Sequence, residues 1–261
     1  MPKTLIEELP KIVERGKKEA RRILDGLSRR NRITLQTNEM VLPTKATGGY
    51  FAQITKELDD KKRFNRMIYG DSLFSIQALL AGDPTTDMSS MRGEIDLIYI
   101  DPPFDSKADY RTKITLPSTT VEQKPTVIEQ FAYADTWKNG TVSYLEMMVP
   151  RLILMRELLS EQGSIYVHID WHVGHYVKVI MDEIFGKDNF RNEIIWRRAY
   201  SHNDGNKFGC IHDTLLFYTK SQDYYFKKVF IPRTEEETSE DYPYIDEKTG
   251  RRYKSVSLVI G

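Results

Sequence analysis

The sequence predicts an α/β fold, because apolar segments of strand length alternate along the chain with segments of helical periodicity. Residues 66–69 and 94–100 have the character of strands, and between them residues 73–80 repeat apolar side chains at helical spacing. Residues 164–170 form another strand-like segment, followed by a helical pattern over residues 173–185. The order strand, helix, strand predicts a βαβ unit with parallel strands and a right-handed crossover.

The helix of this unit has signals at both ends. Asp71 or Ser72 is a suitable N-cap, because either side chain can accept a hydrogen bond from the first turn. Gly82, followed by Pro84, is a typical helix stop.

The later elements follow from similar signals. Residues 143–146 have the form of a capping box. Pro150 predicts a separate helix over residues 150–161, because proline is favoured in a first turn. Residues 192–198 and 214–219 are the last predicted strands, and a polar loop separates them.

A tetrapeptide, Asp101-Pro102-Pro103-Phe104, directly follows the predicted strand over residues 94–100. A carboxylate at the carboxyl end of a buried parallel strand lies where open α/β sheets bind ligands. The two prolines lack N–H donors, so the backbone offers free carbonyls, and the phenyl ring offers a stacking surface. Together these groups suit a flipped-out base with an exocyclic amino group. The alternative is an ordinary turn, because aspartate and proline favour turns in any protein.

These motifs, in this order, resemble those of site-specific S-adenosylmethionine-dependent DNA amino-methyltransferases over about residues 66–220. The chain is most similar to adenine-N6 enzymes of restriction–modification systems, in the permuted class whose catalytic motif precedes the cofactor motif. Asp101 to Phe104 matches the Asp-Pro-Pro-aromatic signature, with Phe where Tyr is commoner. Stacking needs a ring and not a hydroxyl. The resemblance implies a Rossmann-like, mostly parallel sheet with an antiparallel last strand, flanked by helices.

The resemblance also implies site residues, a cofactor and partners. Asp101 and the Pro102 carbonyl are expected to accept hydrogen bonds from the adenine amino group, with Pro103 and Phe104 completing the catalytic motif. Asp71 and Asp101 are the expected contacts to S-adenosylmethionine, because both follow strands that open on one edge of the sheet. The expected partner is double-stranded DNA, and further candidates are a restriction subunit or a second copy of the chain.

Two irregular stretches, residues 105–142 and residues 201–207, are candidate DNA-contacting loops. Four basic side chains in or beside them are expected to contact phosphates: Lys107, Arg197, Arg198 and Lys207. Strand alternation puts Arg197 and Arg198 on opposite faces, so one of the two is a candidate for an internal ion pair.

The family's glycine-rich cofactor motif does not occur in this sequence and would follow residue 261 in the permuted class. We therefore expect an incomplete, carboxyl-truncated sheet. Residues 1–65 are predicted to be a basic, helical amino-terminal extension, residues 66–230 the catalytic core, and residues 231–261 the start of a target-recognition region.

Three functions stay open at this stage. Adenine-N6 methylation is favoured by Asp101, whereas cytosine-N4 enzymes more typically have Ser at that position. A DNA-binding or subunit fragment without activity is favoured by the missing cofactor loop. Methylation of protein glutamine is disfavoured, because the related family uses Asn-Pro-Pro-Tyr.

The formal net charge of zero excludes a wholly basic surface. The basic clusters of residues 1–66 fit a solvated amphipathic helix, with direct phosphate binding as the alternative. The single cysteine and the lack of an apolar membrane-length segment or secretory signal predict a cytoplasmic enzyme. His168, His172 and His175 have spacings of four and three, but His168 is assigned to a different element from the other two. No cysteine or carboxylate set completes a site, so no metal site is predicted.

Overall fold

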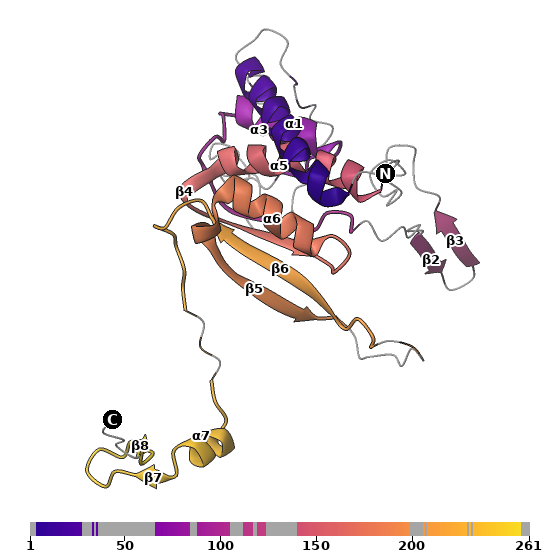
Figure 1. Ribbon diagram of the computed structural model, residues 1–261. Coiled ribbons are helices and arrows are strands. Elements are labelled where there is room, and N and C mark those ends of the chain that lie inside the picture. The colour runs from indigo at the N-terminus through magenta and orange to yellow at the C-terminus, as the bar shows by residue number, and fades with distance from the viewer. Residues whose placement is uncertain are drawn as a thin grey trace, which may run out of the picture. The chain divides into compact units, whose positions relative to one another are not determined.

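The structure is a computed structural model (Figure 1). It describes residues 4–27, 33, 35, 66–83, 88–104, 112–116, 119–123, 140–198, 206, 208–228, 230 and 232–256. The chain divides into two compact units, Met1–Tyr225 and Phe226–Gly261.

The first unit contains a mixed four-stranded sheet with the strand order β1–β4–β6–β5. The strands are β1 (Ile95–Ile100), β4 (Leu159–Ile169), β5 (Phe190–Arg197) and β6 (His212–Thr219). β1 pairs with β4 in parallel, and β6 pairs antiparallel with both β4 and β5. Three strands therefore run in one direction and β6 runs against them, which confirms the predicted antiparallel last strand.

Helices cover one face of this sheet (Figure 1). They are α1 (Leu5–Gly26), α3 (Ser72–Ala81), α5 (Thr141–Leu158) and α6 (Gly174–Phe185). The main core joins α1, α5 and α6 to the covered face of the sheet, through side chains that include Ile12, Leu145, Leu152, Ile165, Val167, Val177, Met181, Leu216 and Tyr218. Alternation along each strand leaves the other side chains on the opposite face.

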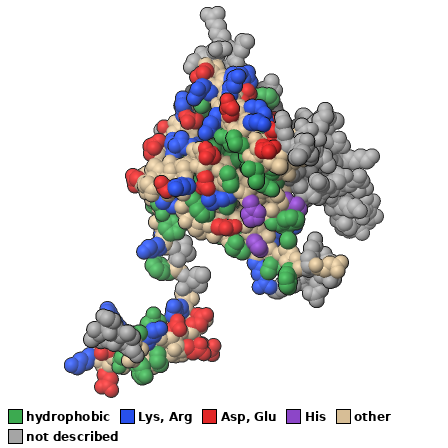
Figure 2. Space-filling model, viewed as in Figure 1, with side chains coloured by type: hydrophobic (Ala, Val, Ile, Leu, Met, Phe, Trp, Pro, Cys, Tyr) green, Lys and Arg blue, Asp and Glu red, His purple; other side chains and the backbone are tan. Residues whose placement is uncertain are grey.

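Helix α1 packs tightly on α5. Thr4 forms a capping box with Glu7 at its start. At Gly16 the two helices approach so closely that a Cβ atom would lie 2.2 Å from Cγ1 of Val149. Basic side chains of α1 form ion pairs with acidic neighbours, among them Arg15 with Glu146. Figure 2 accordingly shows Lys and Arg interspersed with Asp and Glu on the upper part of the molecule.

Two predictions for the first strands are wrong in the described chain. Residues 66–69 are not a strand, because Met67 and Tyr69 are largely exposed and no described strand pairs with them. β1 is not buried on both faces, since it is an edge strand of the described sheet and Leu97 is 61% exposed. The βαβ unit is therefore represented by α3 and β1 alone.

The predicted break at Pro150 is also wrong. α5 runs without interruption from residue 141 to residue 158, and its N-cap is Gly140, so residues 143–146 do not cap it. Proline removes one helical hydrogen bond, but buried side chains on both sides of Pro150 hold the helix in the core. The Arg151 guanidinium also donates to the Met147 carbonyl at 2.9 Å.

The remaining elements are short. Within the stretch predicted to be irregular, β2 (Thr112–Leu116) and β3 (Thr119–Gln123) form an antiparallel hairpin. A 3₁₀ turn, η2 (Lys187–Asn189), precedes β5. The second unit contains α7 (Glu235–Asp241) and the paired strands β7 (Tyr244–Ile245) and β8 (Arg252–Tyr253). Among the described residues, no helix is long and apolar enough to cross a membrane.

Candidate active site

The strand directions bring four chain segments to one edge of the sheet. β1, β4 and β5 end at this edge, and β6 begins there because it runs in the opposite direction. The residues that follow Ile100, Ile169 and Arg197 therefore lie on the same edge as His212 and Asp213. We call this edge the catalytic edge.

The tetrapeptide Asp101 to Phe104 lies on the catalytic edge, as its position after β1 predicts. The backbone pairing of β1 with β4 ends at Ile100 and Val167, so these four residues lie beyond the ladder. The Asp101 side chain is 57% exposed. Phe104 is half-buried and packs with part of its surface against the main core. An accessible carboxylate and a partly accessible ring thus lie within four residues of each other.

His168, near the end of β4, contacts both ends of this tetrapeptide. Its Nδ1 lies 3.7 Å from Oδ1 of Asp101, and its ring centroid lies 5.7 Å from that of Phe104. From its sequence spacing, His168 is a candidate only for metal binding, and that spacing does not predict this arrangement. The available signal was position in the sheet. A residue near the end of a strand that runs parallel to β1 lies beside Asp101, and strand alternation decides which face its side chain occupies.

Asp213 and Arg198 extend the cluster across the sheet. Asp213 is buried, with 5% of its surface exposed. Its Oδ2 lies 3.3 Å from Nε2 of His168, and its Oδ1 accepts from the Arg198 guanidinium at 3.2 Å. Arg198 thus forms an ion pair within the protein, with Asp213. This matches the expectation that either Arg197 or Arg198 pairs internally.

Tyr99 completes the cluster from β1. Its hydroxyl lies 2.8 Å from Nδ1 of His168. Most of the ring is exposed, but the hydroxyl end lies against His168. Partial desolvation, followed by the negative charge of Asp101, raises the pKa of Tyr99. The phenol therefore stays protonated at neutral pH and can donate to His168.

Asp71 belongs to a separate set of contacts. It is the N-cap of α3, and its Oδ1 accepts from the Leu73 N–H at 2.7 Å. Both of its carboxylate oxygens also accept from Arg151, at 2.9 and 3.0 Å. Burial lowers the pKa of Arg151, and the charge of Asp71 opposes that shift. The capping alternative for Asp71 is confirmed, and its carboxylate remains half-exposed.

A second histidine–aspartate pair follows β4. Nδ1 of His172 lies 2.6 Å from Oδ2 of the buried Asp170, and the imidazole stacks on Trp171 with centroids 3.8 Å apart. Figure 2 shows histidines gathered on one face beside hydrophobic side chains. Within the described part of the chain, no group of three or more His, Cys, Asp or Glu residues could hold a metal ion.

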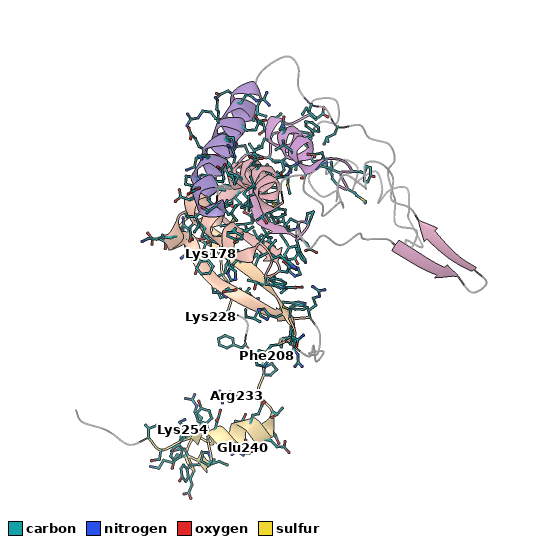
Figure 3. The ribbon with its side chains drawn as sticks, turned by 45° about the vertical axis from the view of Figure 1, so that its right-hand side comes forward. Lys178, Phe208, Lys228, Arg233, Glu240 and Lys254 are labelled. Atoms are coloured by element: carbon teal, nitrogen blue, oxygen red, sulfur yellow. The ribbon has the colours of Figure 1, made fainter. Side chains whose placement is uncertain are left out.

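The remaining predicted DNA contacts are only partly described. Lys107 and Lys207 lie outside the described residues. Arg197 is exposed at the end of β5, next to Arg198. In the same connection to β6, Phe208 is fully exposed (Figure 3). Described apolar and basic side chains thus both occur between β5 and β6.

The chain is similar in sequence to known methyltransferases. The chain is 36% identical over 153 residues to the type II methyltransferase M.EcaI of Enterobacter cloacae. The aligned region covers 58% of this chain and 30% of that protein. It is 30% identical over 156 residues to M.KpnI of Klebsiella pneumoniae, covering 58% and 31%. It is 25% identical over 176 residues to the Mod subunit of the type III restriction-modification enzyme EcoP15I of Escherichia coli, covering 63% and 26%.

The chain thus spans less than a third of the length of these relatives. The family model for DNA methylases of the N6/N4 type matches residues 95–257, which is more than half of the chain and begins at the first residue of β1. On this match the chain belongs to the N6/N4 DNA methylase family.

Proposed function

We propose that this chain carries the catalytic motif of an S-adenosylmethionine-dependent DNA methyltransferase that modifies the N6 amino group of adenine in a restriction–modification system. The observation that carries the proposal is the position of Asp101. Its exposed carboxylate follows β1 at the catalytic edge, and the half-buried Phe104 ring lies three residues further on. Membership of the N6/N4 DNA methylase family supports the reaction class.

The chemistry of the motif fits an exocyclic amine. Such an amine has two N–H donors, and the Asp101 carboxylate and the Pro102 carbonyl are two acceptors one residue apart. Accepting both hydrogens would hold the nitrogen lone pair toward the electrophilic methyl group of the bound cofactor, as in-line methyl transfer requires. Phe104 would stack on the extruded base.

The cofactor fits the described residues in part. S-adenosylmethionine, when bound, supplies an electrophilic methyl group on a sulfonium. Asp71 and Asp101 are half-exposed carboxylates that can accept hydrogen bonds from ammonium or hydroxyl groups. Because Arg151 already fixes the Asp71 carboxylate, that side chain is preorganised as an acceptor.

The proposal assigns DNA contacts to Lys107, Arg197, Arg198 and Lys207 and the start of target recognition to residues 231–261. Double-stranded DNA is then the substrate. The relatives include Mod subunits of type III restriction-modification enzymes, so a restriction subunit is a proposed partner, beside a second copy of the chain.

The test is methyl transfer to duplex DNA by the purified full-length protein with labelled S-adenosylmethionine. Digestion to nucleosides and mass spectrometry identify the product, and we expect N6-methyladenine. Asp101→Ala should abolish transfer and leave DNA binding largely intact. Asp96→Ala is the matched control, because Asp96 lies within β1, before the tetrapeptide, and its carboxylate accepts from Ser160 at 2.8 Å.

The results separate the candidate functions. N4-methylcytosine as the product would assign the cytosine reaction to the same scaffold. Full transfer by Asp101→Ala would refute the role of the tetrapeptide. DNA binding without cofactor binding or transfer by the wild-type protein would favour a DNA-binding or subunit role.

A further inference from the structure

A row of polar side chains crosses all four strands at the catalytic edge. Arg198 follows β5 and pairs with Asp213 on β6, and Asp213 contacts Nε2 of His168 on β4. On the other side of the imidazole, Nδ1 contacts the Tyr99 hydroxyl on β1 and lies near Asp101. The row thus links the exposed catalytic carboxylate to a buried one.

The buried carboxylate fixes the protonation pattern of His168. An ionised carboxylate with 5% of its surface exposed needs donors on its oxygens. Arg198 donates to Oδ1, so Nε2 of His168 is the donor to Oδ2. In the neutral imidazole Nδ1 is then an acceptor, which suits the hydroxyl of Tyr99 as donor. His168 therefore carries its proton on Nε2 and keeps one ring orientation.

The orientation of His168 matters because Asp101 to Phe104 lie beyond the backbone ladder of β1. The imidazole is 15% exposed and packs against the Phe104 ring at a tilt of 53°. The same imidazole lies 3.7 Å from the Asp101 carboxylate. One fixed ring therefore contacts the two side chains to which the base contacts are assigned.

We propose that His168 is a positioning residue for methyl transfer, held by Asp213 and Tyr99, and that its packing sets the orientation of the Phe104 ring at the end of the tetrapeptide. This inference rests on the function proposed above. Loss of orientation in the reacting groups should reduce turnover far more than DNA binding, because a misplacement of 1 Å can lower a rate by about 100-fold.

The kinetic test compares His168→Ala, Asp213→Asn and Tyr99→Phe with the wild type. We expect kcat to fall by about 100-fold for the first two and by less for Tyr99→Phe, with KM for DNA nearly unchanged. Asp213→Asn preserves side-chain shape, so it keeps the test valid if His168→Ala fails to fold. His175→Ala is the control, because His175 is an exposed histidine on α6, outside the row.

A second readout measures the ring directly. Nitrogen–proton NMR should show His168 protonated on Nε2 and His172 protonated on Nδ1, since Asp170 accepts from the opposite nitrogen there. Asp213→Asn should change the pattern of His168 alone, and Asp170→Asn that of His172 alone. If His168 had a merely structural role, Asp213→Asn would not change both the NMR signal of His168 and kcat.

The two proposals fail differently. If Asp101→Ala retains full activity, the proposed function falls. If Asp101→Ala abolishes transfer while His168→Ala and Asp213→Asn keep kcat within about twofold of the wild type, the positioning role falls and the proposed function stands. A proton on Nδ1 of His168 in the wild-type protein would overturn the role of Asp213.

Discussion

The close contact between α1 and α5 predicts how a substitution at Gly16 changes the stability of the first unit. A Cβ atom at Gly16 would lie 2.2 Å from Cγ1 and 2.7 Å from Cβ of Val149. Ordinary contacts are well beyond 3 Å, so the helices would have to separate by about 1 Å or Val149 would have to leave its rotamer. Both atoms belong to a stiff, β-branched residue on a buried helix, which leaves little room for relaxation.

We therefore expect Gly16→Ala to destabilise the first unit. Overpacking at the severe end costs about 3 kcal/mol, and replacing glycine by alanine in a helix offsets about 1 kcal/mol, which leaves a net loss of about 2 kcal/mol. For a unit of this size the melting temperature should fall by roughly 4–8 °C. Urea unfolding followed by circular dichroism measures the loss as a lower midpoint with an unchanged slope.

The same substitution at the end of the helix is the control. Nothing lies within 4 Å of a Cβ atom at Gly26, so Gly26→Ala should be neutral or slightly stabilising. If Gly16→Ala proves as stable as the wild type, α1 does not pack on α5 as described.

Three predictions concern the candidate site. Phe104→Ala should lower transfer by the loss of about 1–3 kcal/mol of base stacking, whereas Phe104→Tyr should retain activity, as measured by initial rates. Asp71→Ala should destabilise the unit by about 1 kcal/mol through loss of the α3 cap, and calorimetric titration should show weaker S-adenosylmethionine binding. The predicted phosphate contacts are Lys107, Arg197, Arg198 and Lys207. Alanine at these positions should weaken binding of target and non-target DNA alike and flatten the slope of log affinity against log salt concentration by about 0.9 per lost contact.

Each of these has an outcome that contradicts it. Equal rates for Phe104→Ala and Phe104→Tyr would mean that the ring serves only the core. Unchanged cofactor affinity in Asp71→Ala would leave Asp71 with the cap and the Arg151 pair alone. An unaltered salt slope after all four substitutions would place the DNA surface elsewhere, such as on the basic side chains of α1. Arg198→Ala should in addition lower turnover, because it removes a partner of Asp213.

Periodicity and turn chemistry predicted most of the sheet from the sequence. The segments of β1, β4, β5 and β6 and the helix α6 were located because each has a clear apolar pattern. The strand predicted over residues 66–69 was wrong, because three apolar residues after Arg66 carry no information about a pairing partner. The helix break predicted at Pro150 was wrong because burial of the side chains on both sides of Pro150 outweighs the local cost of a proline within a helix. Only the packing of α5 reveals this burial.

The site was predictable where it is local in sequence. Asp101 to Phe104 stand together in the chain, so the motif itself identified them. His168 and Asp213 were missed because they come from strands whose order and directions were not worked out residue by residue. Their partnership depends on register, which a single sequence specifies only weakly.

The strand order also bears on how the sheet forms during folding. β5 and β6 are neighbours in the sheet and are joined by residues 198–211, whereas pairing of β1 with β4 must close residues 101–158. The longer closure is entropically less favourable by roughly 1 kcal/mol, and contacts between distant segments slow folding. We therefore expect the β5–β6 hairpin to pair early and the β1–β4 ladder to form late. Assembly of the candidate site would then lag behind the recovery of secondary structure when the unfolded protein is returned to native conditions.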